Sequence, residues 1–182
     1  MIKKLYLTFA GLFLLYMLWP GPGSIFDFKQ LPDSYKSTLA GDNITQVPNV
    51  AGYFSNKYRD FVTNFYRRNY LEKTLLPFPP LRLNHPPEVS WNVIKKHTDS
   101  TYLEEFVYPL RDSLFVNGLE PFYEDGSPKF WGSSQFSEGG KDWYTKTTIR
   151  FYPSSVFVRL IVWFGVCLSI LYTYRLGRKI LS

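Results

Sequence analysis

Hydrophobic residues form two long runs, one near each end of the chain, and are interspersed with polar residues everywhere between them. The runs cover residues 5–19 and 156–174. The second run has 19 residues, about 28 Å as a helix, which nearly matches a hydrocarbon core of roughly 30 Å. This pattern predicts a transmembrane helix over residues 155–175.

The first run has 15 residues and follows Lys3 and Lys4. A charged start with a short apolar centre is also typical of a secretory signal peptide, and Gly21 and Gly23 offer small residues near a cleavage point. Because no Ala-x-Ala pattern is present, the favoured interpretation is an uncleaved signal-anchor helix over residues 1–20. Either interpretation places the middle of the chain outside the cytoplasm.

Basic residues flank both runs on their outer sides. Lys3 and Lys4 precede the first run, and Arg175, Arg178 and Lys179 follow the second. Because basic flanks favour the cytoplasmic side, both termini are expected in the cytoplasm, including a basic tail at residues 176–182. Residues 24–154 are then expected to be extracytoplasmic.

The net charge of +6 arises at the ends of the chain. All 15 acidic residues and 15 of the 21 basic residues lie between the two apolar runs, where they balance. A nucleic-acid-binding domain concentrates basic charge on its folded surface. We therefore expect no nucleic-acid partner, and the excess positive charge suits the anionic headgroups of a lipid bilayer.

The one cysteine, Cys167, lies within the second run. The exported region therefore cannot form a disulfide, whereas small domains of the eukaryotic secretory route usually contain them. We expect a prokaryotic plasma membrane as the location, with the mitochondrial inner membrane as the alternative.

The middle region begins with a segment of helical spacing. Asn49 can serve as an N-cap, and apolar residues then recur every three or four positions, which predicts a helix over residues 49–68. We expect the stripe to face the core; it consists of Val50, Phe54, Tyr58, Phe61, Val62 and Phe65.

Five prolines follow between residues 77 and 87. They predict an extended strap that packs Phe78, Leu81 and Leu83 on the domain surface. Proline suits the first turn of a helix, so a short second helix is expected from Pro87 to residues 95–97.

Beyond residue 101 the pattern changes to strands. Residues 102–108 and 113–118 are β-rich, and residues 143–152 alternate between apolar and polar side chains. Asn117-Gly118 predicts a tight turn, as do residues 124–128 and 139–140. Residues 21–154 are therefore expected to form an α+β domain, with helices first and a small antiparallel sheet after them, between two terminal transmembrane helices.

Candidate chemical groups are few. His97, Asp99 and Glu104 lie close together in sequence, but their spacing matches no known metal-ligand pattern. The serines lack a nucleophile-elbow setting, and no glycine-rich phosphate loop is present. We therefore expect no metal and no cofactor, and favour a role that is not enzymatic.

Aromatic residues make up 19% of the chain. Trp91, Trp131 and Trp143 can stack on the sugar rings of an envelope polymer, with Asn and Asp side chains as hydrogen-bonding partners. The favoured alternative is that these aromatics pack the core of a disulfide-free domain that rests on the membrane interface.

Arg159 is the one charged residue of the second run. Its side chain can snorkel to the interface, or it can contact an acidic residue of a partner membrane helix. The sequence thus favours a two-pass accessory or scaffold subunit of an envelope assembly, bound to the lipid bilayer and to a membrane-protein partner. The alternative is an extracytoplasmic module that binds, or less readily cleaves, an envelope glycan.

Overall fold

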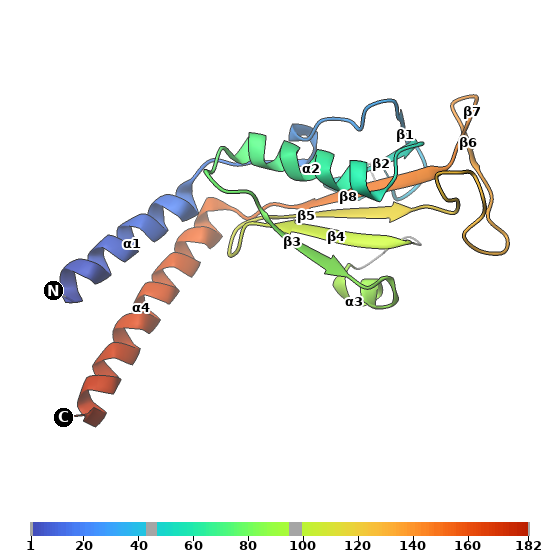
Figure 1. The fold of residues 1–182 in the computed structure, drawn as a ribbon. Coiled ribbons are helices and arrows are strands. Elements are labelled where there is room, and N and C mark those ends of the chain that lie inside the picture. The colour runs from blue at the N-terminus through green and yellow to red at the C-terminus, as the bar shows by residue number, and fades with distance from the viewer. Residues whose placement is uncertain (1, 43–46, 95–99, 182) are drawn as a thin grey trace. The chain divides into compact units, whose positions relative to one another are not determined.

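The computed structural model describes residues 2–42, 47–94 and 100–181 (Figure 1). The chain divides into two compact units. One consists of Met1–Pro20 together with Ser154–Ser182, and the other is Gly21–Pro153. The two units are described one at a time.

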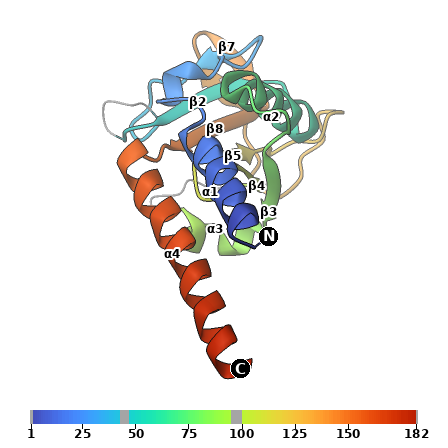
Figure 2. The ribbon, with the colours of Figure 1, turned by 90° about the vertical axis from the view of Figure 1, so that its left-hand side faces the viewer.

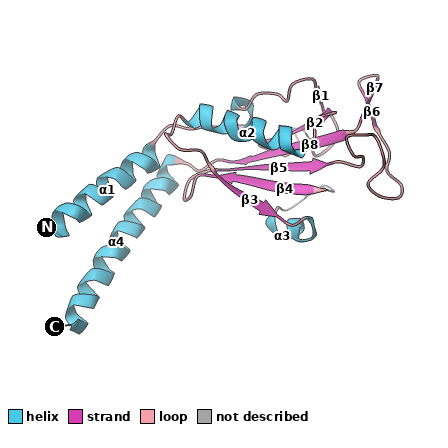
Figure 3. Ribbon diagram, viewed as in Figure 1, coloured by secondary structure: helices cyan, strands magenta, loops and turns pink. Residues whose placement is uncertain are grey.

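Gly21–Pro153 is an α+β unit, as the sequence predicts, built on a six-stranded antiparallel sheet with the order β1-β2-β8-β5-β4-β3. A separate hairpin of two short strands, β6 and β7, adds to it (Figure 3). The strands are β1 (Tyr35–Lys36), β2 (Val50–Ser55), β3 (Leu81–His85), β4 (Tyr102–Val107), β5 (Ser113–Leu119), β6 (Phe136–Glu138), β7 (Lys141–Trp143) and β8 (Thr145–Tyr152). The helical segments are η1 (Ile25–Asp27), α2 (Arg59–Thr74), η2 (Pro87–Val89) and α3 (Ser90–Val93).

Helix α2 covers one face of the sheet (Figure 1). Its inward side carries Val62, Tyr66 and Tyr70, which are fully buried. The Tyr70 ring meets those of Tyr108 and Phe151 edge to face, with centroids 5.1 and 6.1 Å apart. Aromatic packing of this kind lets a domain without disulfides bury a large apolar area.

The predicted helix over residues 49–68 is wrong in its first half. Val50–Ser55 is strand β2, which pairs along its whole length with residues 145–150 of β8 and is buried throughout. Asn49 adopts a left-handed conformation, with φ 58°, and caps no helix there. Apolar residues at positions 50 and 54 fit a strand as well as a helix, and pairing with β8 decides between the two.

The predicted core stripe is also wrong at one position within α2. Phe61 is 46% exposed and stacks on Phe65, which precedes the buried Tyr66. The true start of the helix at Arg59 places Val62, Tyr66 and Tyr70 on the inward side, because residues four apart share a face.

Asn117 and Gly118 lie inside strand β5, so the tight turn predicted there is wrong. Both residues pair with β4 and with β8. The turn between β4 and β5 occurs earlier, where the Tyr108 N–H bonds Asp112 O and the Arg111 N–H bonds Tyr108 O. The predicted turn at residues 139–140 is confirmed, since Gly139 and Gly140 both have positive φ between β6 and β7.

The proline-rich segment contains β3, an edge strand of the sheet. The prediction that it packs its apolar side chains on the domain surface is wrong for two of them. Leu81 and Leu83 are 56% and 44% exposed. Arg82 and Asn84 alternate with them and turn to the opposite face, where they bond residues of β4 and α2.

The terminal unit consists of helices α1 (Ile2–Leu18) and α4 (Val156–Leu181), which pack against each other and run in opposite directions (Figure 2). Within the described residues, one stretch has the length and apolar composition needed to cross a membrane, namely Val156–Ile180 of α4. Side-chain hydrogen bonds join the helices: the Trp163 indole N–H donates to Ala10 O at 2.9 Å, and the Tyr6 hydroxyl donates to Cys167 O at 3.2 Å.

Arg159 lies at the first turn of α4 and is only 7% exposed. Its Nε donates to the Ser154 hydroxyl at 2.8 Å, and its Nη1 lies 3.5 Å from the carbonyl oxygens of Met17 and Trp19. The side chain therefore reaches the C-terminal carbonyls of α1, where a cation is favoured by the helix dipole. The contacts are made within the chain's own terminal unit.

Candidate functional site

An open cavity of 820 Å³ lies in the Gly21–Pro153 unit. Three segments that are far apart in sequence line it: the turn after η1, the connection between β2 and α2, and strand β7. Its lining residues are Gln30, Leu31, Pro32, Asp33, Ser34, Asn56, Lys57, Lys141, Asp142 and Trp143. Trp143 is one of the three tryptophans that the sequence singles out for glycan stacking.

The hairpin that carries Trp143 is held in place by two aromatic contacts. Phe136 of β6 packs on Phe54 of β2 with ring centroids 5.5 Å apart. At the turn, Gly139 lies against the ring of Tyr35, so that a Cβ atom added there would come within 2.5 Å of the ring. Because Gly139 also has φ +64°, glycine suits this position on both counts.

The Trp143 indole is fixed within the hairpin. Its Nε1–H donates to Glu138 O across the turn at 3.0 Å, and the residue is half-buried. The polar edge of the ring is thus satisfied by the backbone. An indole held in one orientation forms a flat apolar surface at little cost in side-chain entropy.

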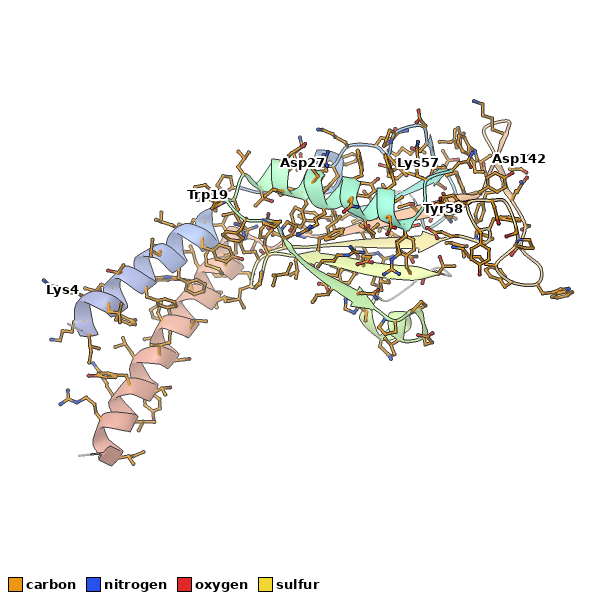
Figure 4. The ribbon with its side chains drawn as sticks, viewed as in Figure 1. Lys4, Trp19, Asp27, Lys57, Tyr58 and Asp142 are labelled. Carbon is orange, nitrogen blue, oxygen red and sulfur yellow. The ribbon has the colours of Figure 1, made fainter. Side chains whose placement is uncertain are left out.

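The other walls of the cavity are fixed by polar contacts. The Lys57 ammonium pairs with Asp33 at 3.1 Å, and the Asn56 amide oxygen accepts from the Tyr144 N–H at 2.9 Å. The Asn56 NH₂ group makes no hydrogen bond to the part of the chain that the structure describes. Figure 4 labels Lys57 and Asp142, two of the four charged residues that line the cavity.

The chemistry of the cavity is polar but electrically balanced. The lining contains two acidic residues, Asp33 and Asp142, and two basic residues, Lys57 and Lys141. Amide, hydroxyl and carboxylate groups supply both donors and acceptors. One aromatic face with mixed donors and acceptors and no net charge suits a neutral, hydroxyl-rich ligand better than a polyanion.

The remaining tryptophans of the sequence prediction do not join this cavity. Trp131 is fully exposed in the segment between β5 and β6 and is absent from the lining. Trp91 lies in α3, and its side chain is not among the described parts. Of the predicted ligand residues, His97 and Asp99 lie outside the described residues.

Glu104, the third predicted ligand residue, forms a buried ion cluster under the N-terminus of α2. Its carboxylate is fully buried and accepts hydrogen bonds from Arg59 at 2.9 Å and from Arg82 at 2.7 Å. Burial raises the pKa of Glu104, but the hydrogen bonds and charges of the two arginines outweigh it and lower the pKa below the usual value. Both carboxylate oxygens accept from arginine, so the cluster ties β3 and β4 to α2.

Glu120 provides the cap of α2, because Tyr58 at the N-cap position makes no side-chain cap bond. One Glu120 oxygen accepts from the Arg59 backbone N–H at 2.6 Å, and the other pairs with Lys129 at 2.7 Å. A carboxylate here satisfies an unpaired N–H and matches the positive end of the helix dipole.

No family model, no curated protein and no solved structure matches this chain. Of the ten lining residues, the sequence singles out Trp143 as a candidate and none of the other nine, which include Asn56 and Lys57. No motif joins them, because three separate segments bring them together.

Proposed function

We propose that this chain is a membrane-anchored binding protein whose Gly21–Pro153 domain takes a neutral glycan of the cell envelope in the Trp143 cavity. The observation that carries the proposal is the fixed indole of Trp143 in an open cavity lined by amide, hydroxyl and balanced charged groups. The proposal covers glycan binding and not glycan cleavage, because the two carboxylates of the lining already have partners: Asp33 pairs with Lys57, and Asp142 accepts from the Ser137 hydroxyl.

In this proposal α1 and α4 both cross the membrane. Charge supports it: the acidic residues all lie between the two helices, whereas Lys3, Lys4, Arg175, Arg178 and Lys179 lie at the ends of the chain. By the preference of basic flanks for the cytoplasm, both termini are cytoplasmic and the domain is outside.

Reporter fusions test this topology directly. An alkaline phosphatase fused at the Gly126 turn is expected to be active, and the same enzyme fused after Ser182 is expected to be inactive. Activity at Ser182 overturns the two-helix arrangement while leaving glycan binding open.

Binding is tested on the full chain in mild detergent, with insoluble chitin beads and soluble N-acetylglucosamine tetramer, both neutral glycans, as probes. Trp143→Ala is expected to weaken retention about tenfold, which corresponds to ~1.4 kcal/mol. Trp143→Phe keeps an aromatic face and is expected to retain part of the affinity. Trp131→Ala, an exposed tryptophan outside the cavity, is the matched control. Equal losses for Trp131→Ala and Trp143→Ala, or no binding by the wild type to either probe, would contradict the proposal.

A second candidate is the accessory subunit of an envelope assembly. The observation that favours it is the apolar edge strand β3, on which Leu81 and Leu83 are largely exposed. An open strand edge can accept a strand from another protein. Arg159 does not add to this candidate, because Ser154 and the end of α1 provide its contacts. Loss of a co-purifying protein in Leu83→Lys, with glycan binding intact, would favour this candidate.

A further inference from the structure

A second cavity lies between the two terminal helices and has a volume of 680 Å³. Its walls are almost wholly apolar and include Leu5, Leu7 and Phe9 of α1 and Ile170 and Leu171 of α4. One charged residue, Lys3, also lines it. The Tyr6 hydroxyl, which bonds Cys167 O, belongs to the lining, whereas the hydrogen bonds of Trp163 and Arg159 to α1 lie further along towards the end of that helix.

The charged residues of the two helices around this cavity are all basic. Lys3 and Lys4 lie in the first turn of α1, and Arg175, Arg178 and Lys179 lie towards the end of α4. Neither helix contains an acidic residue. An apolar space with a lysine on its lining and no acid nearby is complementary to a hydrocarbon chain that ends in an anionic headgroup.

We propose that this cavity binds one acyl chain of an anionic phospholipid, with the lipid phosphate at Lys3. The proposal rests on the membrane placement of α1 and α4 given above. Within a bilayer, an apolar wedge of this kind holds lipid in place of water, because the surface of its wall is almost wholly apolar and offers water few partners.

The position of charge favours an acyl chain over a third helix. The basic residue of the lining, Lys3, lies in the first turn of α1, which is where a lipid phosphate lies if α1 crosses the membrane. A flexible hydrocarbon chain also adapts to an irregular apolar wedge. Binding of a partner helix is an outcome that the filling variant below tests.

Native mass spectrometry of the full chain, released from mild detergent, tests the headgroup. The probes are phosphatidylglycerol and phosphatidylcholine with identical acyl chains. Wild type is expected to retain phosphatidylglycerol at least fivefold better. Lys3→Gln is expected to abolish this preference, whereas the neighbouring Lys4→Gln, which lies outside the lining and is labelled in Figure 4, is expected to keep it. Equal retention of both lipids by wild type overturns the proposal.

A variant that fills the cavity tests whether an acyl chain occupies it. Leu171→Trp adds bulk to the wall and is expected to reduce retention of both lipids several-fold. Leu168→Trp, on an exposed part of α4 outside the lining, is expected to bind as wild type does. If Leu171→Trp instead releases a bound protein, or leaves lipid retention unchanged, the acyl-chain assignment is wrong.

Resistance of the chain to alkaline extraction from membranes separates two kinds of failure. A chain that is extracted contradicts the membrane placement itself. A chain that resists extraction but shows no lipid preference contradicts only the lipid site.

Discussion

Tyr102 places its ring directly against Gly118, its partner across strands β4 and β5. A Cβ atom added to Gly118 would lie 2.1 Å from Cε1 of that ring. Covering a strand glycine with a cross-strand aromatic ring restores the packing that glycine lacks. The contact explains why glycine sits in the middle of β5, where the sequence alone suggests a turn.

Gly118→Ala is therefore expected to destabilise the domain by about 1–3 kcal/mol, the usual cost of overpacking a core. Thermal unfolding of the full chain in detergent, followed by near-ultraviolet circular dichroism, measures the change. Gly23→Ala is the control, because a Cβ there meets only Asp27 at 3.8 Å. An unchanged unfolding temperature for Gly118→Ala would mean that Tyr102 moves aside freely.

The exposure of Phe61 sets a second prediction. Phe61 is 46% exposed and Tyr66 on the same helix is fully buried. Phe61→Ala is expected to cost less than about 1 kcal/mol, while Tyr66→Ala is expected to cost about 3–5 kcal/mol, as for other buried aromatics. The two free energies of unfolding, compared under the same conditions, check the packing of α2. If Phe61→Ala costs more stability than Tyr66→Ala, the assignment of the inward and outward faces of α2 is wrong.

Glu104 predicts how stability depends on pH. Its pKa is lowered in the folded protein below the ordinary value of 4.5 by Arg82 and Arg59. A group with a lowered folded pKa contributes stability above its unfolded pKa and loses it as the pH falls through the folded pKa. The unfolding temperature of wild type is therefore expected to fall more steeply below about pH 4.5 than that of Glu104→Gln.

Glu72→Gln is the control for this pH experiment. Lys29 lowers the pKa of Glu72 as well, but the Glu72 side chain is 48% exposed. Water screens such a pair, so its contribution is small. The slope of stability against pH is expected to stay at the wild-type value in Glu72→Gln. Equal slopes for wild type and Glu104→Gln would show that the buried carboxylate does not carry the acid sensitivity.

The contacts of Arg159 lead to a prediction about the stability of the C-terminal end of α1. Because its guanidinium reaches the last carbonyls of α1, Arg159→Leu is expected to increase fraying of that end. Hydrogen exchange of the backbone amides over residues 10–19, measured in detergent by mass spectrometry, is expected to quicken about tenfold, which corresponds to ~1.4 kcal/mol. Arg159→Lys keeps the charge, so its exchange rate is expected to lie between those of wild type and Arg159→Leu. Unchanged exchange together with release of a bound protein would restore the idea of an acidic partner helix.

The parts of the fold that could be predicted from sequence are those set by local pattern. Alternation over residues 143–152 gave β8, and paired glycines gave the turn between β6 and β7. The start of α2 could not be predicted, because its cap is Glu120, a residue 61 positions away from Arg59. The same holds for the cavity, where Trp143 was recognisable by type but Asn56 and Lys57 come from the distant connection between β2 and α2.

Strand order has a consequence for how the protein is made. β8 lies between β2 and β5 and is the last of the strands that the structure describes, with Val50 opposite Arg150. Until residues 145–152 have been synthesised, the β1–β2 pair has no connection to β5, β4 and β3, and pairings this distant in sequence form slowly. Folding of the domain must therefore wait until synthesis reaches α4. A nascent chain interrupted before that point lacks the central strand, which leaves it recognisable to proteases as unfinished.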